Sequence, residues 1–352
     1  MDPLARWRDR RSWRIPGLIA FVNATRIDPN DVTHRLLLGD GFELIATPLL
    51  DSEGRVTPHA AEAEVIVGGQ RLGRDIFAQL RRCRLLLRPY VGYDDIDIAA
   101  ATAEGILVAN VPDAFIEEVA NHAMALILAA NRKLLQADRY VRSGEWAARR
   151  GRPAWLRPIH RLSGLTLGFV GFGNIARLVA ERARAFSFRM LAYDPYAPAE
   201  AGEPYGVQLV PLEQVLREAD IVTVHTLLSP ETHHLLNAER LALMKPGAYL
   251  VNTSRGPVVD EQALVAALQS GRLAGAALDV MEVEPLPPDS PLCRLDNVIL
   301  TPHIAAYSEE GQLRARQRIA EIVRPVALGR LPERKVVVNK DLYDQIAALL
   351  GA

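Results

Sequence analysis

The sequence is poor in several features that mark particular classes of protein. It has 352 residues but only two cysteines, Cys83 and Cys293, which supports neither a disulfide framework nor a metal cluster and fits a reducing compartment. The formal net charge of -1 offers no global field for nucleic acid or an acidic membrane. No apolar stretch long enough for a signal peptide follows the N-terminal arginines. We therefore expect a cytoplasmic protein with no nucleic-acid partner, no membrane partner and no bound metal.

What the chain does contain is enough apolar sequence for two hydrophobic cores. Hydrophobic residues make up 49% of it and charged residues 24%. The N-terminal segment is crowded with arginine, and we expect it to be a solvated, disordered tail. Its arginines are Arg6, Arg8, Arg10, Arg11 and Arg14.

A glycine turn in the middle of the chain has the setting of a dinucleotide-binding fingerprint. The apolar run 167–170 leads into Gly171, Phe172 and Gly173, and a segment of good helix formers follows. Gly171 permits the tight turn, and Gly173 lets the backbone approach a pyrophosphate on the helix N-terminus. Asp194 ends the next predicted strand, where a carboxylate accepts both hydroxyls of a ribose and disfavours a 2′-phosphate. The pattern therefore predicts a site for NAD.

The position of this turn predicts the domain organisation. A dinucleotide domain normally starts near its fingerprint, so most of the roughly 160 residues before it form another unit, and a long helix over 117–135 carries the chain into the nucleotide domain. Alternating strands and helices precede and follow the turn, and a long helix from Ser308 returns the chain to the first unit. We expect an α/β protein of two domains. One is a Rossmann-type doubly wound parallel sheet that binds NAD at 113–307, and the other is a smaller flavodoxin-like, substrate-binding domain built from both chain ends, 1–112 and 308–352.

The individual elements are predicted from apolar runs and helical periodicity. Before the fingerprint, strands are expected at 18–22, 63–67, 84–88 and 105–109, and helices at 75–82 and 117–135. After Asp194, strands are expected at 220–224, 247–251, 274–280 and 298–300, and helices at 261–270 and 308–323.

Three polar residues follow successive predicted strands of the nucleotide domain. They are Arg255, Glu284 and His303. Ligands of open parallel sheets sit at the carboxyl ends of strands, so these side chains are expected to share one site. A guanidinium matches a carboxylate and keeps its charge, whereas an imidazole exchanges a proton near neutral pH. A carboxylate beside the imidazole favours imidazolium, the form that reduction of a ketone requires.

The motifs, in order and over most of the chain, resemble the D-isomer-specific 2-hydroxyacid dehydrogenase family. They are the glycine turn with Asp194, the stretch Val251-Asn252-Thr253-Ser254-Arg255-Gly256, the stretch from Leu278 to Pro285, and Thr301-Pro302-His303. Further stretches are most similar to the branch around the C-terminal-binding proteins and their bacterial relatives. These begin at Arg88, at Val111 and at Pro302.

The resemblance implies an NAD-dependent oxidoreductase that interconverts a D-2-hydroxy acid and its 2-oxo acid by hydride transfer. It implies that Arg255, Glu284 and His303 form the catalytic set, with His303 supplying the proton. The residues implied for the cofactor are Gly171, Phe172, Gly173, Asn174, Ile175, Asp194, His225, Thr226, Thr253 and Asp279. Those implied for the substrate are Arg88, Tyr90, Val91, Gly92 and Arg255. The family is usually homodimeric through its nucleotide domains.

Several departures from the family pattern put the identity of the acid in doubt. Pro89 and Tyr90 replace a small, adaptable segment of the carboxylate loop, and Ala306 removes an aromatic wall that C-terminal-binding proteins carry. The alternative function is an NAD(H)-sensing dimeric scaffold, or corepressor-like protein, that keeps the dehydrogenase residues. Phosphite oxidation also remains open. A role in serine biosynthesis is not expected, because little chain remains after the last predicted helix for a regulatory domain.

Overall fold

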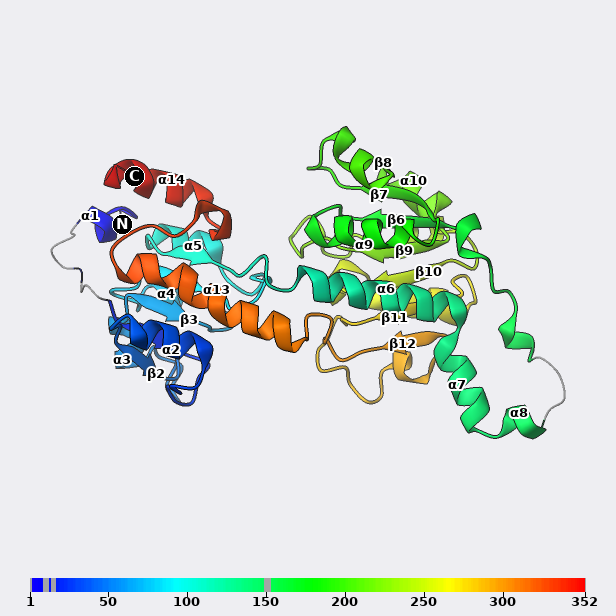
Figure 1. The fold of residues 1–352 in the computed structure, drawn as a ribbon, viewed down its shortest axis with the longest axis horizontal. Coiled ribbons are helices and arrows are strands. Elements are labelled where there is room, and N and C mark those ends of the chain that lie inside the picture. The colour runs from blue at the N-terminus through cyan, green and yellow to red at the C-terminus, as the bar shows by residue number, and fades with distance from the viewer. Residues whose placement is uncertain (1, 9–12, 14–16, 149–152, 352) are drawn as a thin grey trace. The chain divides into compact units, whose positions relative to one another are not determined.

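The computed structural model describes residues 2–8, 13, 17–148 and 153–351, which form two compact units. Unit 1 is built from residues 1–115 and 308–352, and unit 2 from residues 116–307. Each unit consists of a parallel sheet flanked by helices (Figure 1).

The sheet of unit 1 has five parallel strands in the order β2-β1-β3-β4-β5. Its strands are β1 Ile19–Phe21, β2 Leu44–Ala46, β3 Val65–Val67, β4 Leu85–Leu87 and β5 Leu107–Ala109. Four of the five are fully buried apolar runs, as expected for a parallel sheet covered on both faces. The strand order is that of a flavodoxin-like sheet, as the sequence predicts.

Helices from both chain ends complete unit 1. They are α1 Ala5–Arg8, α2 Val32–Gly39, α3 Pro58–Glu62, α4 Arg74–Phe77, α5 Ile98–Ala103, α13 Glu309–Ala327 and α14 Lys340–Leu350. The C-terminal segment is fastened to β5 through Asn339, whose Oδ1 accepts from Val108 N at 2.9 Å and whose Nδ2 donates to Ile106 O at 2.9 Å. The helix predicted over 75–82 is wrong beyond Phe77, because Leu80 N bonds back three residues to Phe77 O and closes a turn.

The prediction of a disordered N-terminal tail is wrong for its first part. Trp7 on α1 is 1% exposed and donates its Nε1 hydrogen to Gly105 O at 2.8 Å. Arg6 donates to the carbonyls of Leu80 and Cys83 at 2.7 and 2.6 Å. A buried tryptophan stabilises this end of the chain more than its arginines favour solvent. The remaining arginines of the predicted tail, Arg10, Arg11 and Arg14, lie outside the described residues.

The sheet of unit 2 has seven parallel strands in the order β12-β11-β10-β9-β6-β7-β8. They are β6 Thr166–Val170, β7 Arg189–Tyr193, β8 Val207–Leu209, β9 Ile221–Val224, β10 Tyr249–Asn252, β11 Gly275–Leu278 and β12 Val298–Leu300. The order reverses between β6 and β9, which is the switch point of a Rossmann-type doubly wound sheet. The predicted α/β fold class is therefore confirmed.

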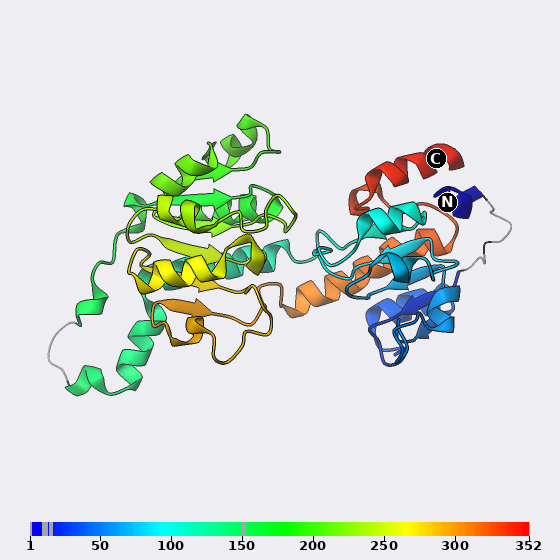
Figure 2. The same cartoon turned by 180° about the vertical axis from the view of Figure 1, so that it is seen from behind.

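Helices lie on both faces of this sheet. The face seen in Figure 1 carries α6 Ile116–Arg132 and α9 Asn174–Arg184, and the face seen in Figure 2 carries α10 Leu212–Glu218, α11 Ala238–Leu243 and α12 Glu261–Gln269. The long helix predicted to Leu135 ends at Arg132, because Lys133 is left-handed with φ +54°, and α7 Leu134–Arg142 and α8 Glu145–Ala148 follow. Short 3-10 helices are η2 Ala154–Leu156, η3 Leu162–Gly164, η4 Ala199–Tyr205, η5 Gly256–Val258, η6 Pro291–Arg294 and η7 Arg334–Val336. Across the described ranges, no helix combines the length and apolar character that crossing a bilayer needs.

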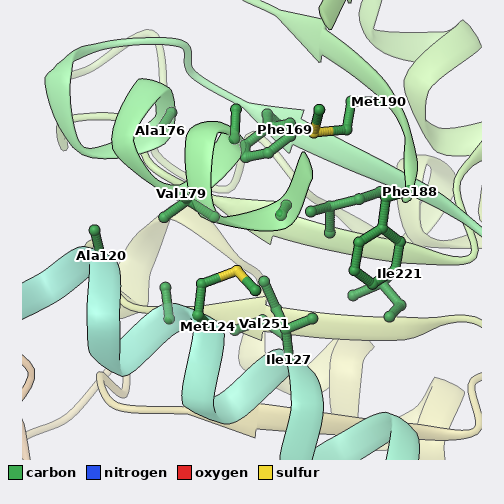
Figure 3. Close-up of a cluster of buried hydrophobic side chains, with 14 of the residues drawn as sticks. Ala120, Met124, Ile127, Phe169, Ala176, Val179, Phe188, Met190, Ile221 and Val251 are labelled. Atoms are coloured by element: carbon green, nitrogen blue, oxygen red, sulfur yellow. The ribbon is translucent and has the colours of Figure 1, made fainter. Parts of the chain in front are cut away.

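Small residues let α9 pack closely against the sheet of unit 2. Ala176 and Val179 on α9 are fully buried against Phe169 of β6, and Met124 and Ile127 of α6 close the same cluster (Figure 3). Ala176 stands at the third position of the fingerprint, where a small side chain keeps helix and strand close. This packing fixes the N-terminus of α9 beside the end of β6.

Candidate active site

The glycine turn after β6 leaves the start of α9 accessible. Gly171 has φ +88°, and a Cβ there would lie 2.8 Å from the backbone carbon of His225, so only glycine fits. Gly173 is the N-cap of α9 without a side-chain cap, and a Cβ there would meet nothing within 4 Å. The free N–H groups of a helix start are a site for an anion such as a pyrophosphate.

Asp194 follows β7 and lies against this turn. Its Oδ2 accepts from Phe172 N at 2.8 Å and its Oδ1 accepts from Tyr196 N at 2.9 Å. The two backbone bonds fix the carboxylate while leaving each oxygen a further acceptor site. The position suits a bond to ribose hydroxyls and opposes a 2′-phosphate of the same sign.

Two residues after neighbouring strands have polar groups that suit a bound cofactor. His225 follows β9, and burial lowers its pKa to about 3, so the imidazole is neutral at physiological pH. Its Nε2 lies 2.9 Å from Thr223 Oγ1. Thr253 follows β10 and is 8% exposed, and its buried Oγ1 has no hydrogen-bond partner among the described residues. An unsatisfied buried hydroxyl indicates a missing ligand group.

These observations fit a dinucleotide at the carboxyl edge of the unit 2 sheet. The uncapped start of α9, the open space at Gly173 and the orphaned Thr253 hydroxyl all belong to that edge. The edge lies at the switch point of the sheet, where ligands of doubly wound proteins bind.

Glu284 and His303 form a close pair in the loops after β11 and β12. His303 Nδ1 lies 2.7 Å from Glu284 Oε2, and Glu284 Oε1 accepts from Met281 N at 3.0 Å. His303 has φ +54°, a left-handed conformation held by the bonds of its N–H to Asp279 O and Thr301 O. Strained non-glycine residues of this kind are concentrated at functional sites.

The pair perturbs the pKa of both groups. The hydrogen bond that His303 donates to Glu284 raises the pKa of His303 above its usual value, against an opposing effect of burial. Burial raises the pKa of Glu284, but the hydrogen bonds from His303 and Met281 outweigh it and the net pKa is lowered. Glu284 is therefore ionised, and His303 keeps its proton to higher pH than a free histidine does.

Arg255 follows β10 in a loop tied to the same region. Its carbonyl accepts from Asn252 Nδ2 at 2.9 Å, and a Cβ at the adjoining Gly256 would lie 1.8 Å from Met281 O. The loop that carries Arg255 therefore contacts the segment just before Glu284. The Arg255 charge lowers the pKa of both Glu284 and His303, which places it within electrostatic range of the pair.

A buried network of hydrogen bonds holds the loop that carries His303. Two of its members, Thr301 and His122, were not predicted as site residues from the sequence. Asp279 is fully buried and accepts from Thr301 Oγ1 at 2.6 Å, Ile304 N at 3.0 Å and Ala305 N at 2.9 Å. His122 on α6 reaches Thr301 Oγ1 at 3.1 Å and Asp279 Oδ1 at 3.4 Å.

Burial raises the pKa of Asp279, but the hydrogen bonds from His122, Thr301 and the backbone outweigh this effect. The net pKa is therefore lowered and the carboxylate is ionised. His122 was not among the residues that the sequence predicts for the site. Its signal was the spacing, because 122 lies three residues after buried Val119 and four before buried Leu126.

The residues predicted for the substrate in unit 1 follow β4. Arg88 is 9% exposed, and its terminal nitrogens contact Gly69 O and Asp95 Oδ1, the latter at 3.1 Å. Val91 O accepts from Asn110 Nδ2 at 2.6 Å, so the loop of Val91 and Gly92 is anchored to the end of β5. Tyr90 is 54% exposed and points its bulk to solvent within unit 1.

One group among the described residues has the composition of a metal site. The ligand atoms of His233, His234 and Glu282 lie within 4.8 Å of one another. The group is satisfied internally, since His234 Nε2 lies 2.6 Å from Glu282 Oε1 and the two rings stack at 4.1 Å. We interpret it as a hydrogen-bonded contact that anchors the loop before α11 to the loop after β11.

Comparison with known proteins supports the same conclusion as the geometry. The model of the D-isomer-specific 2-hydroxyacid dehydrogenase NAD-binding domain matches residues 124–305. A glyoxylate reductase of Korarchaeum cryptofilum is 44% identical over 272 residues, which are 76% of this chain and 80% of that protein. The chain belongs to this family. This dehydrogenase also resembles the crystal structure of D-lactate dehydrogenase from Aquifex aeolicus complexed with NAD and lactic acid, with a TM-score of 0.80 and 29% identity over 91% of this chain and 98% of that one.

Another relative of the dehydrogenase is much longer. A D-3-phosphoglycerate dehydrogenase of Methanocaldococcus jannaschii is 41% identical over 293 residues, which are 83% of this chain but 55% of that protein. The chain therefore spans about half of that relative. The predictions of a family enzyme and of NAD as its cofactor are confirmed, whereas the resemblance to the branch around C-terminal-binding proteins stays a prediction.

Proposed function

We propose that this dehydrogenase interconverts a small D-2-hydroxy acid and its 2-oxo acid with NAD(H), using His303 and Glu284 for proton transfer and Arg255 for the anionic substrate. The observation that carries the proposal is the 2.7 Å contact between His303 Nδ1 and Glu284 Oε2 at the carboxyl edge of the sheet. The edge also holds the glycine turn and Asp194.

The residues that would hold the cofactor are those of the glycine turn, with Asp194, His225, Thr226 and Thr253. When bound, NADH supplies the hydride that reduces the substrate carbonyl. The start of α9 and the Gly173 backbone stabilise the pyrophosphate charge. Asp194 accepts the ribose hydroxyls, so NAD is preferred over NADP. Neutral His225 adds no positive charge to the nicotinamide side.

His303 gives a proton to the carbonyl oxygen during reduction and takes it back during oxidation. Glu284 accepts from Nδ1, so the proton that is exchanged is the one on Nε2. The raised pKa keeps the imidazolium populated near neutral pH, where it is needed as an acid. The hydrogen bond between Glu284 and His303 therefore supports the proposed role in two ways: it orients the ring, and it raises the pKa of His303.

Arg255 binds the carboxylate of the substrate and polarises its carbonyl. A guanidinium cannot lose its proton in this pH range and donates two parallel hydrogen bonds to a carboxylate. The buried Asp279, with Thr301 and His122, positions His303 by fixing the loop on which it lies. The resemblance assigns Asp279 to the nicotinamide carboxamide, which stays a prediction.

Unit 1 is proposed as the substrate-binding domain and unit 2 as the NAD-binding domain. In unit 1, the loop of Tyr90, Val91 and Gly92 would present its backbone N–H groups to the substrate carboxylate. Arg88 contributes by holding this loop through Gly69 and Asp95, and its charge favours an anion nearby. We propose a glyoxylate-sized or lactate-sized substrate, because a glyoxylate reductase and a D-lactate dehydrogenase are among the proteins that this chain resembles.

The test is steady-state oxidation of NADH against a panel of 2-oxo acids. Glyoxylate, pyruvate, hydroxypyruvate and 3-phosphohydroxypyruvate span the relevant sizes, and NADPH replaces NADH in a parallel series. Turnover of the small acids with NADH supports the proposal. Tight binding of NADH without turnover of any acid would instead support an NAD(H)-sensing scaffold, and exclusive turnover of the phosphorylated acid would contradict the proposed size of the substrate.

We also propose that the protein is a homodimer, formed through α7 and α8 of unit 2. These helices carry exposed apolar residues and no buried ones. The exposed residues are Leu134 at 53%, Leu135 at 38%, Val141 at 52% and Trp146 at 64%. An exposed apolar surface of this kind indicates an interface. Light scattering that gives the mass of a single chain at micromolar concentration would contradict the dimer.

A cytoplasmic location is proposed because Cys83 and Cys293 are both free thiols.

A further inference from the structure

Unit 1 contains a cavity of 380 Å³ at the amino edge of its sheet, away from the predicted substrate loop. Two of its lining residues directly precede strands, Glu64 before β3 and Arg84 before β4. A third, Glu104, follows α5, the helix that leads into β5. Arg88 and its loop follow the other end of β4. Parallel strands place these two groups of residues on opposite edges of the sheet.

Arg84 is the unusual member of this cavity. Its side chain is 1% exposed, and none of its three guanidinium nitrogens has a hydrogen-bond partner within residues 2–8, 13, 17–148 and 153–351. Its guanidinium carbon lies 4.2 Å from the centroid of the Trp13 ring. Burial lowers the pKa of Arg84 to about 10, so the group is still charged at neutral pH. A buried charge without hydrogen bonds is strongly disfavoured.

The acidic side chains around Arg84 are engaged by other groups. Glu64 accepts from Leu18 N at 2.8 Å and pairs with Arg82 at 3.1 Å. Glu104 lies 3.9 Å from Arg6. Glu64 is close enough to raise the pKa of Arg84, but no carboxylate oxygen of the described residues bonds to it. Four arginines and three carboxylates line the cavity, so the described lining has one more positive than negative side chain.

We propose that this cavity is a binding site for a small oxyanion, a carboxylate or a phosphate group, with Arg84 as its main contact. A planar guanidinium donates parallel hydrogen bonds to either group, and such charge-assisted bonds would satisfy the nitrogens to which the described part of the chain offers no partner. Arg81 and Arg82 also line the cavity, and each is paired with a glutamate, Arg81 with Glu62 at 2.9 Å and Arg82 with Glu64 at 3.1 Å. The site is distinct from the proposed active site, because its residues precede the strands whose other ends carry the substrate loop.

The test uses the indole N–H signal of Trp13 as a reporter in the full-length enzyme saturated with NADH, so that the cofactor occupies the glycine turn. The signal is assigned by its loss in Trp13→Phe. One arm titrates sodium phosphate and the other sodium acetate, each against sodium chloride at equal ionic strength. The arm that saturates at the lower concentration identifies the anion.

We expect a saturable change of the Trp13 signal in at least one arm. Arg84→Met should weaken binding by roughly tenfold or more, the equivalent of one charge-assisted hydrogen bond. Arg55→Met, which removes an exposed arginine paired with Asp51 elsewhere in unit 1, should leave the titration unchanged. If Arg84→Met does not fold, Arg84→Lys replaces it and should weaken binding to a smaller extent. Failure of both anions to move the wild-type signal beyond chloride, or an undiminished response in Arg84→Met, overturns the proposal.

Discussion

The substitution Glu284→Gln separates the charge of the carboxylate from its shape. Glutamine keeps a hydrogen-bond acceptor near His303 Nδ1, so the ring is still oriented, but the interaction that favours imidazolium is weakened. Hydrogen bonds to charged groups are worth about 1.5–3 kcal/mol, and the lower end applies here because the pair is partly exposed, with side-chain exposures of 47% and 33%. Loss of that interaction lowers the population of the imidazolium at alkaline pH by roughly tenfold.

The sign of the pH effect follows from the direction of the shift. The pKa of His303 is raised in the folded enzyme, so the acid form persists above the usual range and is lost as pH rises through the raised pKa. In Glu284→Gln the alkaline fall of kcat/KM for oxo-acid reduction should move toward acid pH. Activity at the alkaline end should drop by roughly tenfold, and activity at the acid end should drop less. The assay is initial-rate NADH oxidation from about pH 5 to about pH 9.

Glu282→Gln is the matched control. Glu282 lies two residues earlier in the same loop and contacts His234 at 2.6 Å instead of His303. Its replacement should leave the alkaline fall where it is in the wild type. An alkaline fall that does not move in Glu284→Gln, or that moves equally in both variants, would refute the reasoning.

Four further substitutions test the remaining parts of the site. Arg255→Ala should raise the KM for the oxo acid and lower kcat while leaving the NADH dissociation constant within about threefold, and equal losses in both would contradict its role. Asp194→Ala should relax the preference for NADH over NADPH, measured as the ratio of kcat/KM values, and an unchanged ratio would mean that the ribose is held elsewhere. Gly171→Ala should destabilise the fold by about 1–3 kcal/mol in urea denaturation, because of its φ of +88° and the clash at His225. Gly173→Ala should leave stability nearly unchanged yet weaken NADH binding, since its Cβ enters only the open space before α9; unaltered NADH affinity would place the pyrophosphate elsewhere.

The parts of the fold that could be predicted are those set by local sequence. The run 167–170, the two glycines and the apolar strand before Asp194 are contiguous signals, and the structure has β6, α9 and β7 at these positions. Two edge strands, β2 and β8, were not predicted. Each has only three residues, and neither is a fully buried apolar run, so no periodicity distinguishes them from loops.

The parts that could not be predicted depend on contacts between distant segments. Asp279 obtains its partner His122 from a helix more than a hundred residues earlier, and no local pattern connects the two. Trp7 is buried and donates to the carbonyl of Gly105, almost a hundred residues later, and a count of N-terminal arginines does not reveal this contact. The helix predicted over 75–82 stops at Phe77 although its composition favours a longer helix, because Leu80 N bonds back to Phe77 O and closes a turn.

The most direct test of the central claim is pre-steady-state turnover of His303→Gln. We expect NADH to bind with nearly wild-type affinity, because no cofactor contact is removed. Oxo-acid reduction should fall by about 10²–10⁴-fold, the usual contribution of a positioned acid. Near-normal turnover in this variant would contradict the assignment of His303 as the group that gives the proton.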